Sequence, residues 1–407
     1  MRRQDELRAR AVAARDRVAP LGPDVDLNSF ERVGPPDGDA SEAELGALGE
    51  EERLRLQQAG IDPEGAGRGG SYFQRDAAVL QCGSSQPGVE ILPIRQALAT
   101  CPWVWDYYWK LVDVGTDKFT AAAELELHDG YVIRAMPGSK TDQPVQACLY
   151  LAKENLRQNV HNLVIAESGS ELHVITGCAT SPHLRRGLHV GVTEFFVKED
   201  AQLTFTMVHN WAEDMVVRPR SVAHVAAGGL FLSNYICMRP VSSLQMYPTT
   251  VLAGEGAVGR FYSVVVSSPG SEHDIGSRIR LQAPHTRAEI VSRAISGGGR
   301  VIARGHLVGE ASSARAHLEC RGLLLGGGLV QAVPELEGRV EGVELSHEAA
   351  VGRIAQEEIH YLMARGLTED EATSTIVRGF LSVDIPGLPP PLRAEIDRAV
   401  TAAQAGT

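Results

Sequence analysis

Apolar and polar residues alternate along most of the chain between residues 168 and 325, and short turns of small and charged residues separate the alternating segments. This phrase recurs roughly every 25–30 residues, a period typical of solenoids, propellers or arrays. Its copies begin at Ser168, Glu199, Ala227, Gly254, Pro284 and Gly309. Because alternation predicts strands, we expect a β-solenoid whose coils bury their inner faces against their neighbours. A β-sandwich is the alternative, although its strands recur faster.

The first 70 residues are expected to form a helical or flexible arm. A charged, Ala/Arg-rich pattern predicts a helix from Asp5 to Val18, and a second is expected from Ser41 to Gln58. Ser41 is a suitable N-cap for the second helix, and Glu44 completes a capping box. The arm is either a mobile extension or a packed helical domain.

Residues 71–118 are expected to form an N-terminal helical cap, followed by the solenoid core over residues 119–338. Trp103, Trp105 and Trp109 lie close together in the cap. Such a cluster could stack on nucleotides. A hydrophobic plug over the open end of the solenoid is the interpretation we favour, because such an end needs a cover.

The remaining residues, 339–407, are expected to form a C-terminal helical domain. The period becomes helical from His347, with a helix from Ala350 to Arg365 that Gly366 ends. Thr368 and Glu371 then supply a capping box for the next helix. This unit could be a cap or a docking surface.

Composition narrows the class of protein. The 407 residues carry a formal net charge of -12 and only 5% aromatic residues. The core has no Lys/Arg run of the kind that binds nucleic acid. It has no apolar stretch of about 20 residues, and the start lacks a signal-peptide core, so we expect a cytoplasmic protein without membrane contact. Six cysteines without a CxxC pair favour free thiols, metal ligands or sulfur carriers over disulfides.

Motifs in order along residues 71 to 382 resemble the SufB/SufD family of iron–sulfur cluster assembly proteins. They are Asp129-Gly130-Tyr131-Val132, Ile165-Ala166-Glu167-Ser168-Gly169-Ser170, Gly177-Cys178-Ala179-Thr180-Ser181-Pro182, Asn210-Trp211, Tyr247-Pro248, Gly259-Arg260-Phe261-Tyr262-Ser263-Val264, Asp274-Ile275-Gly276, Val291-Ser292-Arg293-Ala294-Ile295-Ser296, Cys320-Arg321-Gly322, Ser346-His347-Glu348 and Tyr361-Leu362-Met363-Ala364-Arg365-Gly366-Leu367.

The resemblance implies a mainly β fold: a right-handed parallel β-helix core flanked by N-terminal and C-terminal helical domains. It implies a dimer formed through the β-helix ends, either a homodimer or a heterodimer with a SufB/SufD paralogue. It also implies docking of a SufC-like ABC ATPase on the C-terminal helices. Since the chain has no GxxxxGK[ST] loop, any ATP hydrolysis would belong to that partner, and we expect a scaffold rather than an enzyme. The expected docking residues are Ile359, Tyr361, Leu362, Arg365, Gly366, Leu367, Ile376 and Phe380.

The resemblance also assigns chemistry to four residues. Cys178 matches the cysteine that accepts sulfur from a cysteine desulfurase system. Cys320, His347 and Glu348 match residues at which a transient iron–sulfur cluster is built at the dimer interface, where both chains' copies would converge. Thiolate, imidazole and carboxylate together are plausible iron ligands. The alternative for Cys178 is a small buried core residue, and for His347 and Glu348 a polar cap on a helix.

Two departures from the family pattern leave the role open. Ser346-His347-Glu348 replaces the Glu-His-Glu common in SufB, and Thr250 stands where SufB often has cysteine. The mixture suggests a single protein that replaces both SufB and SufD. A SufD-like adaptor that holds no cluster is one alternative. A carbohydrate-active β-helix enzyme is the other, but it would need paired carboxylates on one face. Cluster type and electron donor are not determined by the sequence.

Overall fold

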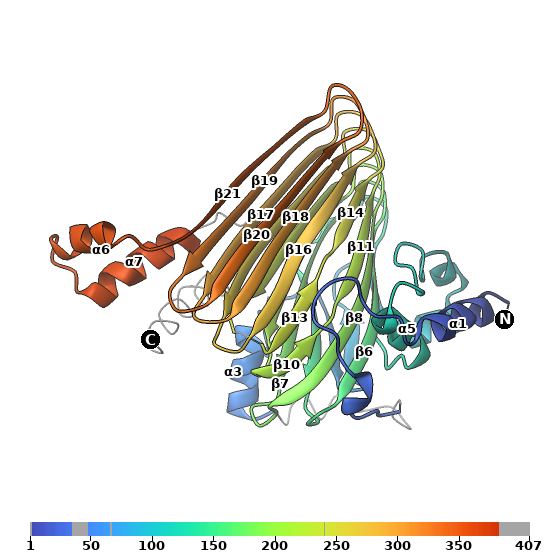
Figure 1. The fold of residues 1–407 in the computed structure, drawn as a ribbon. Helices are drawn as coiled ribbons and strands as arrows, with labels where there is room; N and C mark the ends of the chain where they lie inside the picture. Colours follow the sequence, from blue (N-terminus) through green and yellow to red (C-terminus); the bar gives the residue numbers. More distant parts are fainter. Residues whose placement is uncertain (1, 35–47, 66, 240, 382–407) are drawn as a thin grey trace.

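A computed structural model of the chain describes residues 2–34, 48–65, 67–239 and 241–381. These residues form a β-solenoid with helices near both ends (Figure 1), as predicted. Within them the walls are a ten-stranded and an eleven-stranded sheet. Strand pairs are parallel except β1–β2 and β3–β4, which lie at the first coil.

The ten-stranded sheet contains the strands that the recurring phrase predicts. Its order is β2 (Ala78–Ser84), β1 (Gly70–Arg75), β5 (Val145–Leu151), β7 (Glu171–Thr180), β9 (Gln202–Asn210), β12 (Leu230–Cys237), β15 (Val258–Ser267), β17 (Arg287–Ser296), β19 (Arg315–Leu324) and β21 (Glu344–Arg353).

The eleven-stranded sheet is the opposite wall. It contains β3 (Val89–Pro93), β4 (Tyr131–Ala135), β6 (Arg157–Ala166), β8 (Arg186–Val197), β10 (Asp214–Val217), β11 (Arg220–Val225), β13 (Ser243–Met246), β14 (Thr249–Leu252), β16 (Glu272–Leu281), β18 (Arg300–Gly309) and β20 (Leu329–Gly338). Each coil therefore has one strand in the ten-stranded sheet and one or two strands in the eleven-stranded sheet. Their inward side chains meet in one core that includes Val174, Phe205 and Leu318.

The turns between the two sheets explain the recurring phrase. Successive turns each place one residue at positive φ, including Gly169, Asp200 and Gly228. Their backbone groups also bond from coil to coil, because Gly169 N–H donates to Glu199 O and Asp200 N–H to Ala227 O, both at 2.9 Å. Small and short polar residues suit this conformation, so they recur at the coil period.

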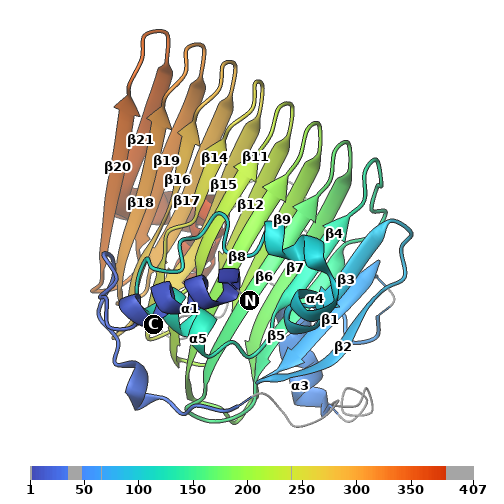
Figure 2. The ribbon, with the colours of Figure 1, turned by 90° about the vertical axis from the view of Figure 1, so that its right-hand side faces the viewer.

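The Trp-rich segment lies elsewhere than expected. The predicted helical cap begins with the strands β1 to β3, and only then follow α4 (Ile94–Thr100), the 3-10 turn η2 (Pro102–Asp106) and α5 (Lys118–Leu125). Trp103, Trp105 and Trp109 pack with α1 (Arg2–Ala14) against outward residues of β4, β6 and β8. The cluster is thus a hydrophobic plug on a side wall (Figure 2), not over the solenoid end.

One buried carboxylate fixes that plug to the wall. Glu194 of β8 accepts backbone N–H bonds from Trp109 at 2.7 Å and from Val112 at 3.0 Å. It also accepts one from Leu111 at 2.5 Å and contacts His161 Nε2 at 2.9 Å. Because Glu194 is fully buried, these donors replace the water that its charge would otherwise need.

The described part of the N-terminal arm is packed on the solenoid. Arg218 donates to Pro23 O at 3.2 Å on one wall. On the other, Asn210 donates to Arg55 O of α3 (Glu50–Gln58) at 2.9 Å. Of the helix predicted from Ser41 to Gln58, the described part contains α3, with Gly49 as its N-cap, and residues 35–47 lie outside the described part. A 3-10 turn, η1 (Leu27–Ser29), lies between the two contacts.

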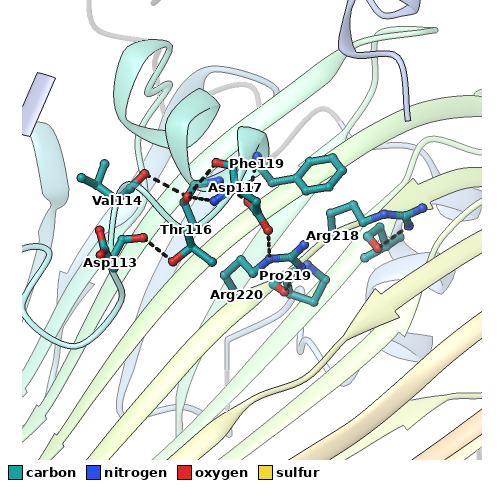
Figure 3. Close-up of polar contacts among 10 residues, drawn as sticks. Asp113, Val114, Thr116, Asp117, Phe119, Arg218, Pro219 and Arg220 are labelled. Atoms are coloured by element: carbon teal, nitrogen blue, oxygen red, sulfur yellow. Dashed lines mark hydrogen bonds and ion pairs between the residues drawn. The ribbon is translucent and has the colours of Figure 1, made fainter. Parts of the chain in front are cut away.

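A proline and an arginine lie next to each other between two strands of the wall. Pro219, between β10 and β11, cannot donate to the ladder. Next to it, Arg220 donates to Pro219 O and to the buried carboxylate of Asp117, both at 2.8 Å (Figure 3). Asp117 also caps α5 by accepting from Thr120 N at 3.0 Å. The arginine therefore ties the wall to α5.

The helix predicted from Ala350 to Arg365 begins later than expected. Residues 344–353 form β21, which pairs with β19 along its length, and α6 runs only from Gln356 to Met363. The Ala-rich stretch that suggested a helix alternates as a strand, with Leu345 on the core side. The predicted capping box at Thr368 and Glu371 is confirmed, and it begins α7 (Glu369–Leu381). No helix in the described ranges has the length and apolarity to cross a membrane.

Candidate functional site

Cys178 lies inside the solenoid. It belongs to the inner core, is 0% exposed, and is the third residue from the end of β7. Burial raises the pKa of its thiol well above the usual range, so the resting thiol is protonated. The alternative stated for Cys178 from the sequence, a small buried core residue, describes its position correctly. The space beside its thiol, however, is not filled.

That space is an interior cavity of about 40 Å³ between the two sheets. Side chains from both walls line it, including Cys178, His189, Met207, His209, Pro219, Tyr235, Pro248 and Phe261. Buried free cysteines usually pack tightly against apolar neighbours. A cavity with imidazoles, hydroxyls and thioethers around one thiol is a different environment, and it has room for a water-sized group beside the thiol.

Two histidines of the cavity are held in fixed orientations. His189 Nδ1 lies 2.9 Å from Gln158 Oε1, and His209 Nδ1 lies 2.8 Å from the Tyr235 hydroxyl. Burial lowers the pKa of His189 to about 3 and that of His209 well below its ordinary value. Both imidazoles are therefore neutral at physiological pH.

A row of small and polar side chains leads from the cavity toward Cys320. In the register of the ten-stranded sheet, one inward column contains Thr176, Met207, Tyr235, Ser263, Ser292 and Cys320. The cavity itself reaches Phe261 on β15. The two serines continue the polar row past it, on a face whose other columns are mostly apolar.

Cys320, His347 and Glu348 are close in the fold but do not share one face. Cys320 points inward from β19, is 1% exposed, and burial raises the pKa of its thiol to about 11. His347 pairs with the inward Leu318, so it lies on the same face of the sheet. Glu348 pairs with Glu319 on the outer face, where it binds Arg321 at 2.9 Å. A single chain does not bring the three predicted ligands together.

The end of the solenoid that carries these residues is open. Both β20 and β21 are last strands of their sheets, and β21 is exposed along most of its length. Leu329 and Val351, 50% and 42% exposed, add apolar surface there. Among the residues that the structure describes, no group of three or more His, Cys, Asp or Glu side chains is placed to hold a metal ion. Unpaired edge strands are templates for pairing with another chain.

The expected docking residues fall on α6, α7 and the loop between them. Ile359 is 6% exposed, whereas Tyr361 is 59% exposed and lies under the guanidinium of Arg365. Gly366 follows α6 with φ +97°, as a helix C-terminus favours. Val377 and Leu381 of α7 cluster with outward residues of the ten-stranded sheet, so α6 projects from the solenoid (Figure 1).

Sequence reasoning missed the surroundings of Cys178. None of the motifs that carry the family resemblance contains His209 or Tyr235. The coil period contained the signal, because it places His209 beside Cys178 in the next strand and Tyr235 one strand further. The period alone does not show where the packing of these side chains leaves a cavity.

Comparisons with known proteins point to one family. Residues 149–380 match the model of the SUF system FeS cluster assembly, SufBD core domain. An iron-sulfur cluster assembly SufBD family protein of Archaeoglobus fulgidus is 48% identical over 362 residues, covering 89% of this chain and 97% of the relative.

Two further relatives cover different lengths. A SufBD family protein of Methanothermobacter thermautotrophicus strain Winter is 45% identical, with 96% of each chain covered. One of Staphylococcus epidermidis is 33% identical over 72% of this chain and 64% of the relative. Each of these matches is to an iron–sulfur cluster assembly protein of the SufBD family. The chain belongs to the SufBD family of the SUF system.

Proposed function

We propose that this chain is a scaffold on which an iron–sulfur cluster is assembled, with separate places for accepting sulfur and for building the cluster. Cys178 accepts sulfane sulfur inside the solenoid. Cys320 and His347 hold the nascent cluster at the open end. The observation that carries the proposal is the inward row of small and polar side chains that runs within one sheet from the cavity beside Cys178 to Cys320.

Sulfur leaves Cys178 as sulfide in this scheme. A persulfide on Cys178 reacts with two thiols of an external reductant, which restores the Cys178 thiol, releases hydrogen sulfide and leaves a disulfide in the reductant. Hydrogen sulfide or its anion is small enough to pass between Ser263 and Ser292 when the inner side chains move. Iron is also a substrate, and it enters at the open end.

A second chain completes the cluster site. Edge pairing of β21 with a β21 strand of a second copy, or of a paralogue, would bring two sets of Cys320, His347 and Glu348 to one seam. Glu348 would then contribute its carboxylate to the seam after leaving Arg321. An exposed ion pair of this kind contributes about 0–1 kcal/mol, so the exchange is inexpensive.

A SufC-like ABC ATPase docks on α6 and α7 in this scheme, with Tyr361 and Arg365 on the exposed side of the contact. The free energy of ATP hydrolysis there would move the two ends of a dimer relative to one another. This proposal places the protein in the cytoplasm, where iron, a cysteine desulfurase system and reductants meet.

A SufD-like adaptor is the second candidate function. The observation in its favour is that the described residues of one chain hold no three-ligand group. Anaerobic reconstitution with ferrous iron and sulfide separates the two. The scaffold predicts a charge-transfer absorption band in the wild type that Cys320→Ala and Glu348→Gln lose while their folding stays intact. An unchanged band in both variants would move the cluster elsewhere, and no band in any protein would favour the adaptor.

A further inference from the structure

The eleven-stranded wall has a gap in its hydrogen-bond ladder between two neighbouring coils. Pairing of β10 with β13 ends at Val217, and pairing of β11 with β14 begins again only at Val222. Among the described residues, no ladder pair joins 218–221 to 245–248. Each of these two stretches contains a proline, which cannot donate a ladder hydrogen bond, namely Pro219 and Pro248.

The gap faces the cavity beside Cys178. Because side chains alternate along extended backbone, every second residue of the two stretches points inward. The inward residues line the same cavity as Cys178, and they are Pro219, Ser221, Met246 and Pro248. The wall therefore lacks backbone pairing at the level of the Cys178 thiol.

Two other parts of the chain cover the outer side of the gap. One is α5, whose N-cap Asp117 accepts a hydrogen bond from Arg220 at 2.8 Å (Figure 3). The other is the segment of residues 20–33, here called the strap. Arg218 of the gap donates to Pro23 O of the strap at 3.2 Å. Both covers are thus bound by arginines of the gap itself.

Gly22 lets the strap lie close against the gap. Its backbone N–H donates to Asp274 Oδ2 of β16 at 3.2 Å, and its φ is +74°. A Cβ atom at this position would lie 2.5 Å from Cγ of Gln245, an outward residue of the gap. A residue with a side chain would therefore push the strap away from the wall.

The strap is bound mainly through its backbone. From Pro23 to Val33, the carbonyl of every second residue accepts a hydrogen bond from the wall, from α5 or from the adjoining turns. In chain order the donors are Arg218, Lys118, Arg157 Nη1, Asn155, Arg157 N–H and His128. Because these bonds are separate, the end of the strap over the gap can open locally while the rest stays bound.

Two buried polar atoms at the gap have no partner among the residues that the structure describes. They are Nε of Arg218, which is 0% exposed, and Oε1 of Gln245, which is 3% exposed. Buried polar groups without a protein partner normally bind water. A water-sized molecule therefore finds polar contacts at the gap.

We propose that this gap is a lateral entrance through which a low-molecular-weight persulfide presents its terminal sulfur to Cys178, and that Gly22 and Pro23 of the strap cover it. The identity of the entering molecule rests on the proposed role of Cys178. Since the cavity measures about 40 Å³, it has room for the terminal sulfur of a donor but not for a whole protein side chain that carries it.

The test measures how fast methyl methanethiosulfonate, a small thiol reagent, labels individual cysteines of the full-length protein, followed by mass spectrometry. Cys148 is the internal reference, because it is also buried but lies in the cluster that α3 forms with the outer face of the other wall. Labelling of a buried thiol follows the population of the open state, so Gly22→Val should raise the rate at Cys178 about tenfold and leave Cys148 unchanged. Glu31→Gln removes an exposed ion pair with Lys153 further along the strap, and as the matched control it should change neither rate.

Ser221→Leu tests the gap itself. Ser221 lines the cavity, and a leucine there would narrow the gap from the inside. Alone it should lower the labelling rate of Cys178, and in the Gly22→Val background it should bring the rate back toward that of the wild type. Circular dichroism and urea unfolding report whether each variant folds, and Ser221→Leu alone decides the question if Gly22→Val does not.

The outcomes are separable. Equal increases at Cys178 and Cys148 in Gly22→Val would show a general loosening and would overturn the inference. A rate at Cys178 that neither Gly22→Val nor Ser221→Leu changes would also overturn it, because the reagent would then enter elsewhere. Access that depends on the strap, combined with no loading of Cys178 by cysteine persulfide, would overturn the proposed sulfur-acceptor role and leave the entrance intact.

Discussion

Cys178 and Cys320 lie on the inner face of the same sheet, five strands apart in the order β7-β9-β12-β15-β17-β19. At about 4.8 Å for each strand, their backbones are about 24 Å apart. Direct transfer of sulfur from one thiol to the other is therefore impossible within one rigid chain. Either sulfur moves through the interior or the two cysteines serve unrelated purposes.

Blocking the inner row distinguishes these two cases. Ser292 is buried directly before Cys320 in the column. Ser292→Leu would fill the row, and we expect cluster assembly from a persulfide donor to fall at least tenfold while loading of Cys178 stays normal. Overpacking costs about 1–3 kcal/mol, so the variant should still fold. Ser292→Ala, which removes the hydroxyl without adding volume, is the control. Equal assembly rates in both variants would show that sulfur does not use this path.

A substitution of Glu348 should remove the cluster without lowering the stability of the fold. Glu348 forms an ion pair with Arg321, and both side chains are about half exposed, 55% and 42%. Glu348→Gln should therefore change the free energy of unfolding by less than about 1 kcal/mol. The same variant should lose the reconstituted cluster. A large loss of stability in urea unfolding would mean that Glu348 is a structural residue and that the missing cluster is a consequence.

The open edge predicts the oligomeric state. Val351→Lys places a charge on the exposed edge strand β21, where it would be buried by a second chain. We expect the wild type to be dimeric and this variant to shift toward monomer in analytical ultracentrifugation. Val18→Lys is the control, because Val18 is 59% exposed and lies in the N-terminal arm. A dimer that survives Val351→Lys would place the interface elsewhere.

Buried neutral histidines predict acid sensitivity. Burial lowers the pKa of His189 to about 3 and that of His273 to about 4, whereas both titrate near 6.5 in the unfolded chain. The unfolded state therefore binds more protons between these values. Stability should be full above pH 6.5 and fall below it, with a slope approaching 1.4 kcal/mol per pH unit for each histidine.

Urea unfolding at pH 7 and pH 5 measures this loss. His273→Gln should reduce the difference between the two pH values, and the exposed His183→Gln should leave it unchanged. Identical losses in all three proteins would assign the acid sensitivity to other groups.

The buried carboxylate of Glu194 predicts a large effect on stability. Glu194→Gln keeps the shape but removes the charge that three backbone N–H groups and His161 contact. Hydrogen bonds to a buried charge are worth about 1.5–3 kcal/mol each at most, and we expect a total loss of roughly 2–4 kcal/mol. Glu171→Gln, at an exposed ion pair with Lys140, should cost less than about 1 kcal/mol. Similar losses in both variants would contradict this account of the plug.

The sequence predicts the coils because the turns are local. Residues such as Gly169 and Asp200 indicate turns, because their residue types tolerate the positive φ that each turn requires. The alternation of apolar and polar residues indicates which side chains face inward. It does not predict β21, because Ala349 and Ala350 favour a helix in isolation and only pairing with β19 makes them a strand.

The candidate site, too, could be predicted from the sequence only in part. Motifs point to Cys178 and Cys320, but the opposite facing of His347 and Glu348 follows from a register that no local pattern contains. The contact of Glu194 with the Trp-rich loop joins residues more than 80 positions apart, and so it has no local signature either.

The most direct test of the central claim follows labelled sulfur from Cys178 into the cluster. Anaerobic protein is loaded with ³⁴S-labelled cysteine persulfide, freed of donor, and given ferrous iron and dithiothreitol. We expect label on Cys178 and then in a cluster in the wild type, label without a cluster in Cys320→Ser, and neither in Cys178→Ser. A labelled cluster formed by Cys178→Ser at the rate of the wild type would contradict the account.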